Sequence, residues 1–169
     1  MPGVMPQRSR LRLRGSMAQW SKLQKRLYDL ISPEIDLQIH CGVYRMQSQY
    51  GSAGLPRYWI TLGKEIIWDY PKMLVEQPQL GEAPLEWYPY GTDIRNISDL
   101  LREYIDTPAE DLLEKEFVND HWGLTNILKA ADRRFGRRRL QLLKKRIGNK
   151  AARKVLMKRM QVVATEPAA

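Results

Sequence analysis

The sequence predicts an α+β fold in which an N-terminal helix and a small antiparallel β-meander are followed by a helical C-terminal half. Apolar residues recur at helical spacing from Trp20, alternate strictly from Leu37, and return to helical spacing after residue 100. The length of 169 residues, with 43% apolar and 28% charged residues, suits one globular domain. We expect a flexible basic extension at 1–16, a single α+β domain at 17–147, and a basic helical tail, frayed at its end, at 148–169.

The first 16 residues carry four arginines and no acid, and no apolar stretch of the length that a secretory signal needs. These arginines fall at every second position, so a helix would not gather them on one face. A helical pattern opens at Met17, which we expect to be the natural start. This helix should end at Ser32-Pro33, because the residue before proline is pushed out of the α region. Its apolar face consists of Trp20, Leu23, Leu27, Leu30 and Ile31.

Three strands are expected next. Residues Leu37–Tyr44 alternate between apolar and mostly polar positions, the pattern of a half-buried strand. A polar, glycine-rich stretch at Gln47–Gly54 should be a loop leading to a second strand at Tyr58–Leu62. Gly63-Lys64 favours a tight turn into a third strand at Glu65–Asp69. The helix before these strands should cover one face of the resulting meander.

An irregular acidic loop is expected at residues 71–92, because four prolines within it preclude a long helix or a central strand. It carries Trp87, Tyr88 and Tyr90. These aromatic residues are candidates for a protein-partner site, although aromatic residues inside a proline-rich loop more often fix that loop to the core. The sequence leaves both interpretations open.

The helical half begins with apolar residues around Leu100 and Tyr104. Thr107-Pro108-Ala109-Glu110 has the form of a capping box with proline at the first helical position, which predicts a helix start there. Asp120 is placed to cap the next helix, which should include Trp122, Ile127 and Leu128.

Little in the sequence favours catalysis. The adjacent residues His40 and Cys41 should point to opposite faces of a strand, so they cannot form a thiolate–imidazole pair. Asp120 and His121 are better explained as a cap and a first-turn residue than as metal ligands. No phosphate-binding glycine loop or serine elbow occurs. We therefore predict no catalytic residue, no metal site and no cofactor, although the many carboxylates leave a metal-dependent nuclease as a third hypothesis.

Charge is distributed unevenly along the chain, whose formal net charge is +9. Residues 17–132 hold 11 bases and 18 acids, whereas residues 133–169 hold 13 bases and a single acid. Within the basic block, Leu140, Leu143 and Ile147 define one apolar helical face, and Gly148-Asn149 can separate this helix from a second basic helix. Clustered cations of this kind create a local positive potential that attracts polyanions.

The leading hypothesis is accordingly a non-enzymatic protein that binds RNA or DNA through phosphate contacts of this C-terminal segment. Two other interpretations of the same cations remain. The helix could lie on an anionic membrane or dock in a partner's groove, or its cations could form salt bridges to carboxylates of the preceding helices. The second function hypothesis is a protein-interaction or immunity-type module that uses the loop 71–92. The predicted phosphate-binding residues are Arg133, Arg134, Arg137, Arg138, Arg139, Lys144 and Lys145.

Three short motifs resemble a family of small, uncharacterised bacterial proteins. They are Trp20-Ser21-Lys22-Leu23, the pair Trp59-Ile60-Thr61 and Gly63-Lys64-Glu65-Ile66, and the run from Asp132 to Leu140. The resemblance covers about residues 18 to 140 and implies a shared fold and a bacterial cytoplasmic setting, without implying a mechanism. One cysteine excludes an intramolecular disulfide, and no window reaches the roughly 20 apolar residues of a membrane-spanning helix, so no membrane insertion is expected.

Overall fold

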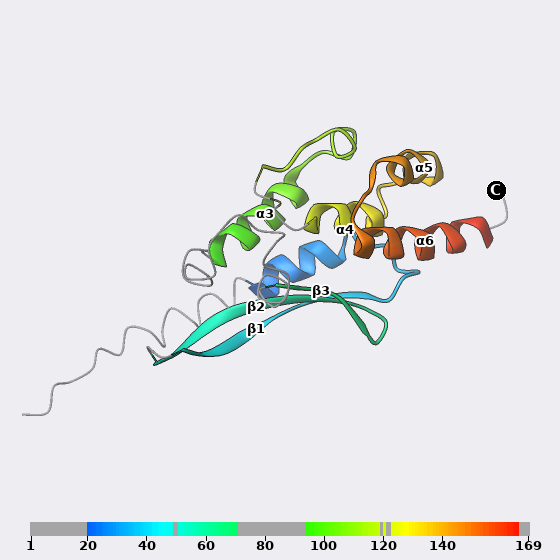
Figure 1. Ribbon diagram of the computed structural model, residues 1–169. Helices are drawn as coiled ribbons and strands as arrows, with labels where there is room; N and C mark the ends of the chain where they lie inside the picture. Colours follow the sequence, from blue (N-terminus) through cyan, green and yellow to red (C-terminus); the bar gives the residue numbers. More distant parts are fainter. Residues whose placement is uncertain (1–19, 49–50, 71–93, 119, 121–122, 166–169) are drawn as a thin grey trace, which may run out of the picture.

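The computed structural model describes residues 20–48, 51–70, 94–118, 120 and 123–165 (Figure 1). Within these ranges, a helix at residues 20–28 precedes three strands and four further helices, and the predicted α+β order is confirmed. The strands are β1 (Leu37–Ser48), β2 (Gly51–Leu62) and β3 (Glu65–Tyr70). The helices are α3 (Ile94–Asp106), α4 (Leu124–Ala131), α5 (Arg137–Arg146) and α6 (Lys150–Thr165).

The three strands form one antiparallel sheet in the order β1-β2-β3. The predicted loop at Gln47–Gly54 is wrong, because β1 continues to Ser48 and β2 begins at Gly51, with these two residues paired. Once the hairpin register is set, backbone pairing continues through residues of low strand propensity. Pro56 is accommodated because it lies where β2 pairs with β1 alone, so its missing N–H costs no bond to β3.

The turn between β2 and β3 is where the sequence predicts it. Leu62 pairs with Glu65, and Gly63 between them has φ +59°, a backbone conformation that other residues rarely adopt. A bulge between Ile60 and Thr61 shifts the register of this hairpin. The Gly63-Lys64 prediction is therefore confirmed.

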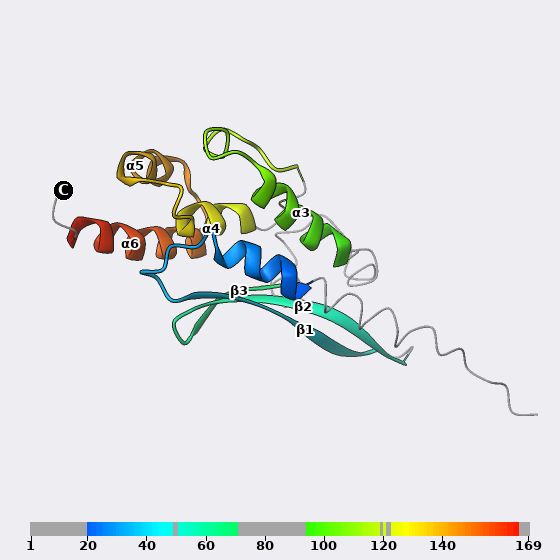
Figure 2. The same cartoon turned by 180° about the vertical axis from the view of Figure 1, so that it is seen from behind.

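All helices of the described residues lie on one side of the sheet, with the N-terminal helix directly against it in both views (Figures 1 and 2). Side chains on the helix-facing side of the sheet are buried, among them Ile39, Ile60 and Trp68. The same hydrophobic cluster includes Trp20 and Leu27 from the N-terminal helix. It also extends into the C-terminal helices, through Leu140, Leu143, Ala152, Val155 and Leu156. The basic C-terminal segment is thus anchored to the rest of the molecule by a buried apolar face.

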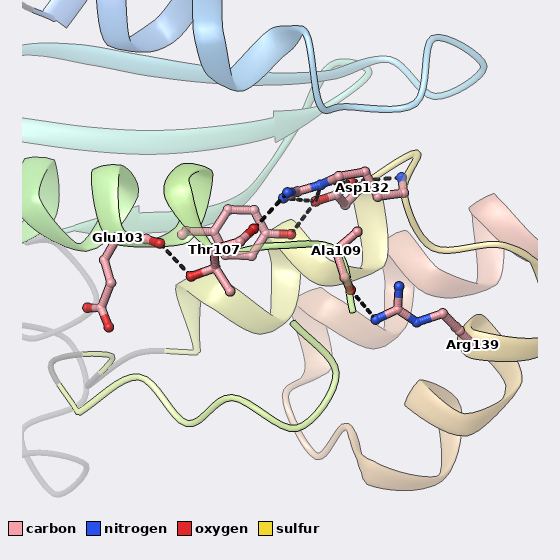
Figure 3. A network of polar contacts seen from close by, with 7 residues as sticks. Glu103, Thr107, Ala109, Asp132 and Arg139 are labelled. Atoms are coloured by element: carbon pink, nitrogen blue, oxygen red, sulfur yellow. Dashed lines mark hydrogen bonds and ion pairs between the residues drawn. The ribbon is translucent and has the colours of Figure 1, made fainter. Parts of the chain in front are cut away.

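The predicted helix start at Thr107–Glu110 is wrong: residues 109–114 form turns. Instead of capping a new helix, the Thr107 hydroxyl donates to the carbonyl oxygen of Glu103 at 2.6 Å (Figure 3), and it also accepts from Lys115 Nζ at 3.0 Å. The hydroxyl therefore donates to a free carbonyl at the end of α3, instead of accepting from a free N–H group at the start of a new helix.

Asp120 does cap α4, as predicted. Its two carboxylate oxygens accept from the backbone nitrogens of Leu124 and Thr125 at 2.8 and 3.0 Å. The helix begins only at Leu124, after Gly123, and Trp122 lies outside the described residues. Helix α6 is capped by Asn149, whose Oδ1 accepts from the backbone nitrogen of Ala152 at 3.0 Å. Among the helices of the described ranges, none is both long enough and apolar enough to cross a membrane.

Candidate nucleic-acid interface

The acid at the start of the basic motif, Asp132, is buried, with 1% of its surface exposed. Its Oδ2 accepts from the Tyr104 hydroxyl at 2.7 Å and from Arg134 Nη2 at 2.7 Å. Its Oδ1 accepts from the backbone nitrogen of Arg134 at 2.8 Å. A carboxylate buried in this way is tolerable only because it is paired and hydrogen-bonded. Asp132 therefore joins α3 to the segment that leads into α5.

Two of the seven predicted phosphate-binding residues are engaged within the chain. Arg134 has a side-chain exposure of 19% and donates from Nη1 to the carbonyl oxygen of Thr107 at 2.9 Å, in addition to its bonds with Asp132. Arg139 donates to the carbonyl oxygen of Ala109 at 2.5 Å (Figure 3), and its guanidinium lies 4.5 Å from the centre of the Phe135 ring. Both guanidinium groups hold the turn segment after α3 against the start of α5, which is a structural role.

The other five predicted residues are exposed to solvent and form no ion pair with a carboxylate of the described residues. Four of them belong to α5, whose sequence holds six cations in ten residues and no acid. By contrast, Arg146 at the end of the same helix pairs with Glu114 at 2.8 Å. The exposed and unpaired set is Arg133, Arg137, Arg138, Lys144 and Lys145.

The cations of α5 border a hollow of about 730 Å³ that opens between α5 and α6. Its lining residues are Arg138, Gln141, Leu142, Lys144, Lys145 and Met160. Positions 138, 141, 142 and 145 follow the i, i+3, i+4, i+7 spacing of one helix face, so these side chains share one side of α5. Two cations, Arg138 and Lys145, lie on this side, and with Lys144 the lining holds three positive charges around one concave surface.

The first turn of α5 adds to this positive potential. It contains three arginines and no acid, and its N-cap residue Gly136 supplies no side-chain hydrogen bond. Because the N-terminus of a helix carries a partial positive charge, these cations are placed against the helix dipole. An anion bound near this turn would be attracted by the cations and by the dipole together.

Two other cations of the described residues are buried. Arg159 is 6% exposed, and its Nη1 pairs with Glu34 at 2.7 Å. Lys129 is also buried, and it donates to the carbonyl oxygen of Lys115 at 3.1 Å, while desolvation by burial lowers its pKa. Arg159 follows Val155 and Leu156 at helical spacing, so the periodicity of α6 already indicates an inward position.

The remaining candidate site residues divide into those that the structure describes and those that lie outside the described residues. The ring of His40 stacks on the ring of Trp59, with ring centres 5.0 Å apart. Cys41 lies on the other side of the strand, where burial raises the pKa of its thiol. The predicted separation of His40 and Cys41 is therefore confirmed. Within the described ranges, no group of three or more potential ligands could hold a metal ion. The loop 71–92 with Trp87, Tyr88 and Tyr90, and also His121, lie outside the described residues.

The buried Tyr104 hydroxyl makes the fold less stable at alkaline pH. Burial and the neighbouring Asp132 charge raise the pKa of Tyr104 well above its ordinary value. The folded state therefore keeps a proton that the unfolded state loses above about pH 10, so the stabilisation is complete below that pH and declines above it.

We expect the stability advantage of the wild type over Tyr104→Phe to shrink by up to about 1.4 kcal/mol per pH unit above pH 10. Urea unfolding of both proteins from neutral to alkaline pH measures this difference. Parallel stability curves across that range would contradict the assignment of this titration to Tyr104.

The chain was compared with protein-family models, curated proteins and solved structures. The family model of the SF0329 protein family matches residues 19–160. The matched range reaches beyond the three motifs and includes all of α5 and most of α6, so the basic helices belong to what the family model describes. Neither the curated proteins nor the solved structures gave a significant match. The chain belongs to the SF0329 protein family.

Proposed function

We propose that this protein binds RNA or DNA non-enzymatically, through phosphate contacts made by the exposed cations of α5 and by Arg133. The observation that carries the proposal is the set of exposed cations without ion pairs to described carboxylates, three of which border one hollow. Guanidinium and ammonium groups donate to phosphate oxygens, and each neutralised phosphate releases condensed counterions. The resemblance of the three motifs to bacterial proteins supports a bacterial cytoplasmic setting.

This proposal replaces the seven predicted residues by a smaller set. Arg134 and Arg139 are assigned to the fold, because their guanidinium groups have partners within the chain. Among the predicted residues, Arg137, Arg138, Lys144 and Lys145 share the short helix α5, so their charges act on the same stretch of a bound strand. Contacts of this kind position a nucleic acid without reading its sequence.

The test is the triple variant Arg138→Gln, Lys144→Gln, Lys145→Gln, with labelled RNA and DNA oligonucleotides in fluorescence anisotropy across a salt series. The slope of log affinity against log salt concentration is negative, and loss of three phosphate contacts should make it shallower by about 2 to 3. With 1 M salt as the reference, this corresponds at about 50 mM salt to a loss of affinity on the order of a thousandfold.

A matched control is available, because Lys22, Lys25 and Lys64 are exposed cations on the N-terminal helix and the β2–β3 turn. Their triple replacement by glutamine removes the same charge and should leave most of the affinity. Equal losses in both triple variants would show that net charge alone drives binding and would contradict an interface on α5. Substitution is preferable to truncation, because removal of α5 and α6 would expose the core.

A further inference from the structure

We infer that the nucleic acid bound at this site is single-stranded, and that one of its unpaired bases enters the hollow between α5 and α6. The inference rests on the proposed function and deepens it. It follows from the mixed chemistry of the lining, because a site that contacted phosphates alone would need only cations.

The apolar part of the lining consists of Leu142 on α5 and Met160 on α6. Leu142 is 38% exposed, and Met160 is partly buried against the core, so both present apolar surface to the same opening as Arg138 and Lys145. The flat face of a base is itself apolar and packs against side chains of this kind, while the phosphates on either side of it need cations. The hollow supplies both the apolar surface and the cations.

The size of the hollow favours an unpaired base over a duplex. The hollow has a volume of about 730 Å³ and is open to solvent rather than enclosed, so a base can enter it from the surface. A duplex keeps its bases stacked inside and would present sugar and phosphate to Leu142 and Met160, where no apolar partner would face them. A single strand can turn a base outward without breaking a pair.

Gln141 gives the lining its one neutral amide, and it follows Arg138 by three residues and precedes Lys145 by four. Arg138 and Lys145 lie about 10 Å apart along α5 at 1.5 Å per residue, so the amide is placed between two phosphate-binding positions. Its side chain offers two donors and one acceptor oxygen, the groups that pair with base edges. A base held between these cations therefore meets a hydrogen-bonding partner as well as an apolar wall.

The experiment compares a labelled single-stranded oligonucleotide with the duplex of the same sequence, using the full chain and two variants of the lining, Leu142→Ser and Gln141→Ala. We expect the single strand to bind about tenfold more tightly than the duplex, and Leu142→Ser to weaken single-strand binding about fivefold or more. Gln141→Ala should weaken it several-fold without perturbing the fold, since this side chain is exposed. Duplex binding should change little in either variant.

The control is Met157→Ser, because Met157 is also an apolar residue of α6, is 62% exposed and does not line the hollow. Its replacement should leave single-strand affinity unchanged. Equal affinity for the two nucleic acids, with both lining variants unaffected, would overturn the inference and leave the proposed function standing. Binding to neither nucleic acid, with binding to phosphatidylserine vesicles, would overturn both, because the cations would then serve a membrane surface.

Discussion

Replacement of Asp132 by alanine is expected to lower the free energy of unfolding by about 3 to 5 kcal/mol, because it leaves a buried hydrogen-bonded charge pair without its acid. The Tyr104 hydroxyl and the Arg134 guanidinium both lose their shared acceptor. Tyr104 is almost fully buried and Arg134 mostly so, and water cannot readily replace the lost bonds. The link between α3 and the entry to α5 is removed with them.

Urea unfolding measures this loss, and two variants calibrate it. Asp132→Asn keeps the shape and one acceptor oxygen, so its cost should be smaller than that of alanine. Glu114→Ala removes the acid of the exposed Arg146–Glu114 pair, where solvent screens the charges, and it should change stability little. A cost for Asp132→Ala as small as that for Glu114→Ala would contradict a structural role for the motif's acid.

Replacement of Phe135 by alanine is expected to lower the free energy of unfolding by about 3 to 5 kcal/mol, the usual cost of removing a large ring from a core. Phe135 is fully buried immediately before α5, and its ring also lies under the Arg139 guanidinium at 4.5 Å. The substitution therefore creates a cavity and also removes a cation–π contact worth about 0.5 to 2 kcal/mol.

The same unfolding measurement tests this expectation, with Val118→Ala as the control for loss of apolar atoms at an exposed site. Val118 is 89% exposed, so its truncation should leave stability nearly unchanged. An Arg139→Met variant keeps the ring and removes the guanidinium, so it measures the cation–π contact together with the hydrogen bond to the carbonyl oxygen of Ala109. A Phe135→Ala variant as stable as the wild type would show that α5 is held mainly by Leu140 and Leu143.

The motif from Asp132 to Leu140 combines two kinds of residue that sequence alone does not separate. Asp132, Phe135 and Leu140 are buried, and Arg134 and Arg139 bind groups of the same chain. Arg133, Arg137 and Arg138 remain exposed. A guanidinium in a sequence can be a phosphate ligand or a structural donor, and the partner that decides between them, such as the carbonyl oxygen of Ala109, is 30 residues away in the chain.

The errors in the predicted elements have the same origin. The Thr107 capping box is a valid local pattern, yet its hydroxyl bonds to the end of α3 at the Glu103 carbonyl. The stretch around Gly51 has a loop composition, yet pairing with β1 makes it part of a strand. In each case a neighbouring element offered the backbone or side chain a better hydrogen-bonding partner than the local pattern did.

The sequence by itself determined the order of helices and strands, the turn at Gly63, the cap at Asp120 and the concentration of positive charge after residue 132. These follow from periodicity, backbone sterics and composition, which act over a few residues. Only the tertiary structure decided which cations are buried, which are paired and which surround the hollow between α5 and α6. That selection depends on contacts between segments far apart in the chain, such as Arg159 with Glu34, and the spacing of residues along a sequence does not contain it.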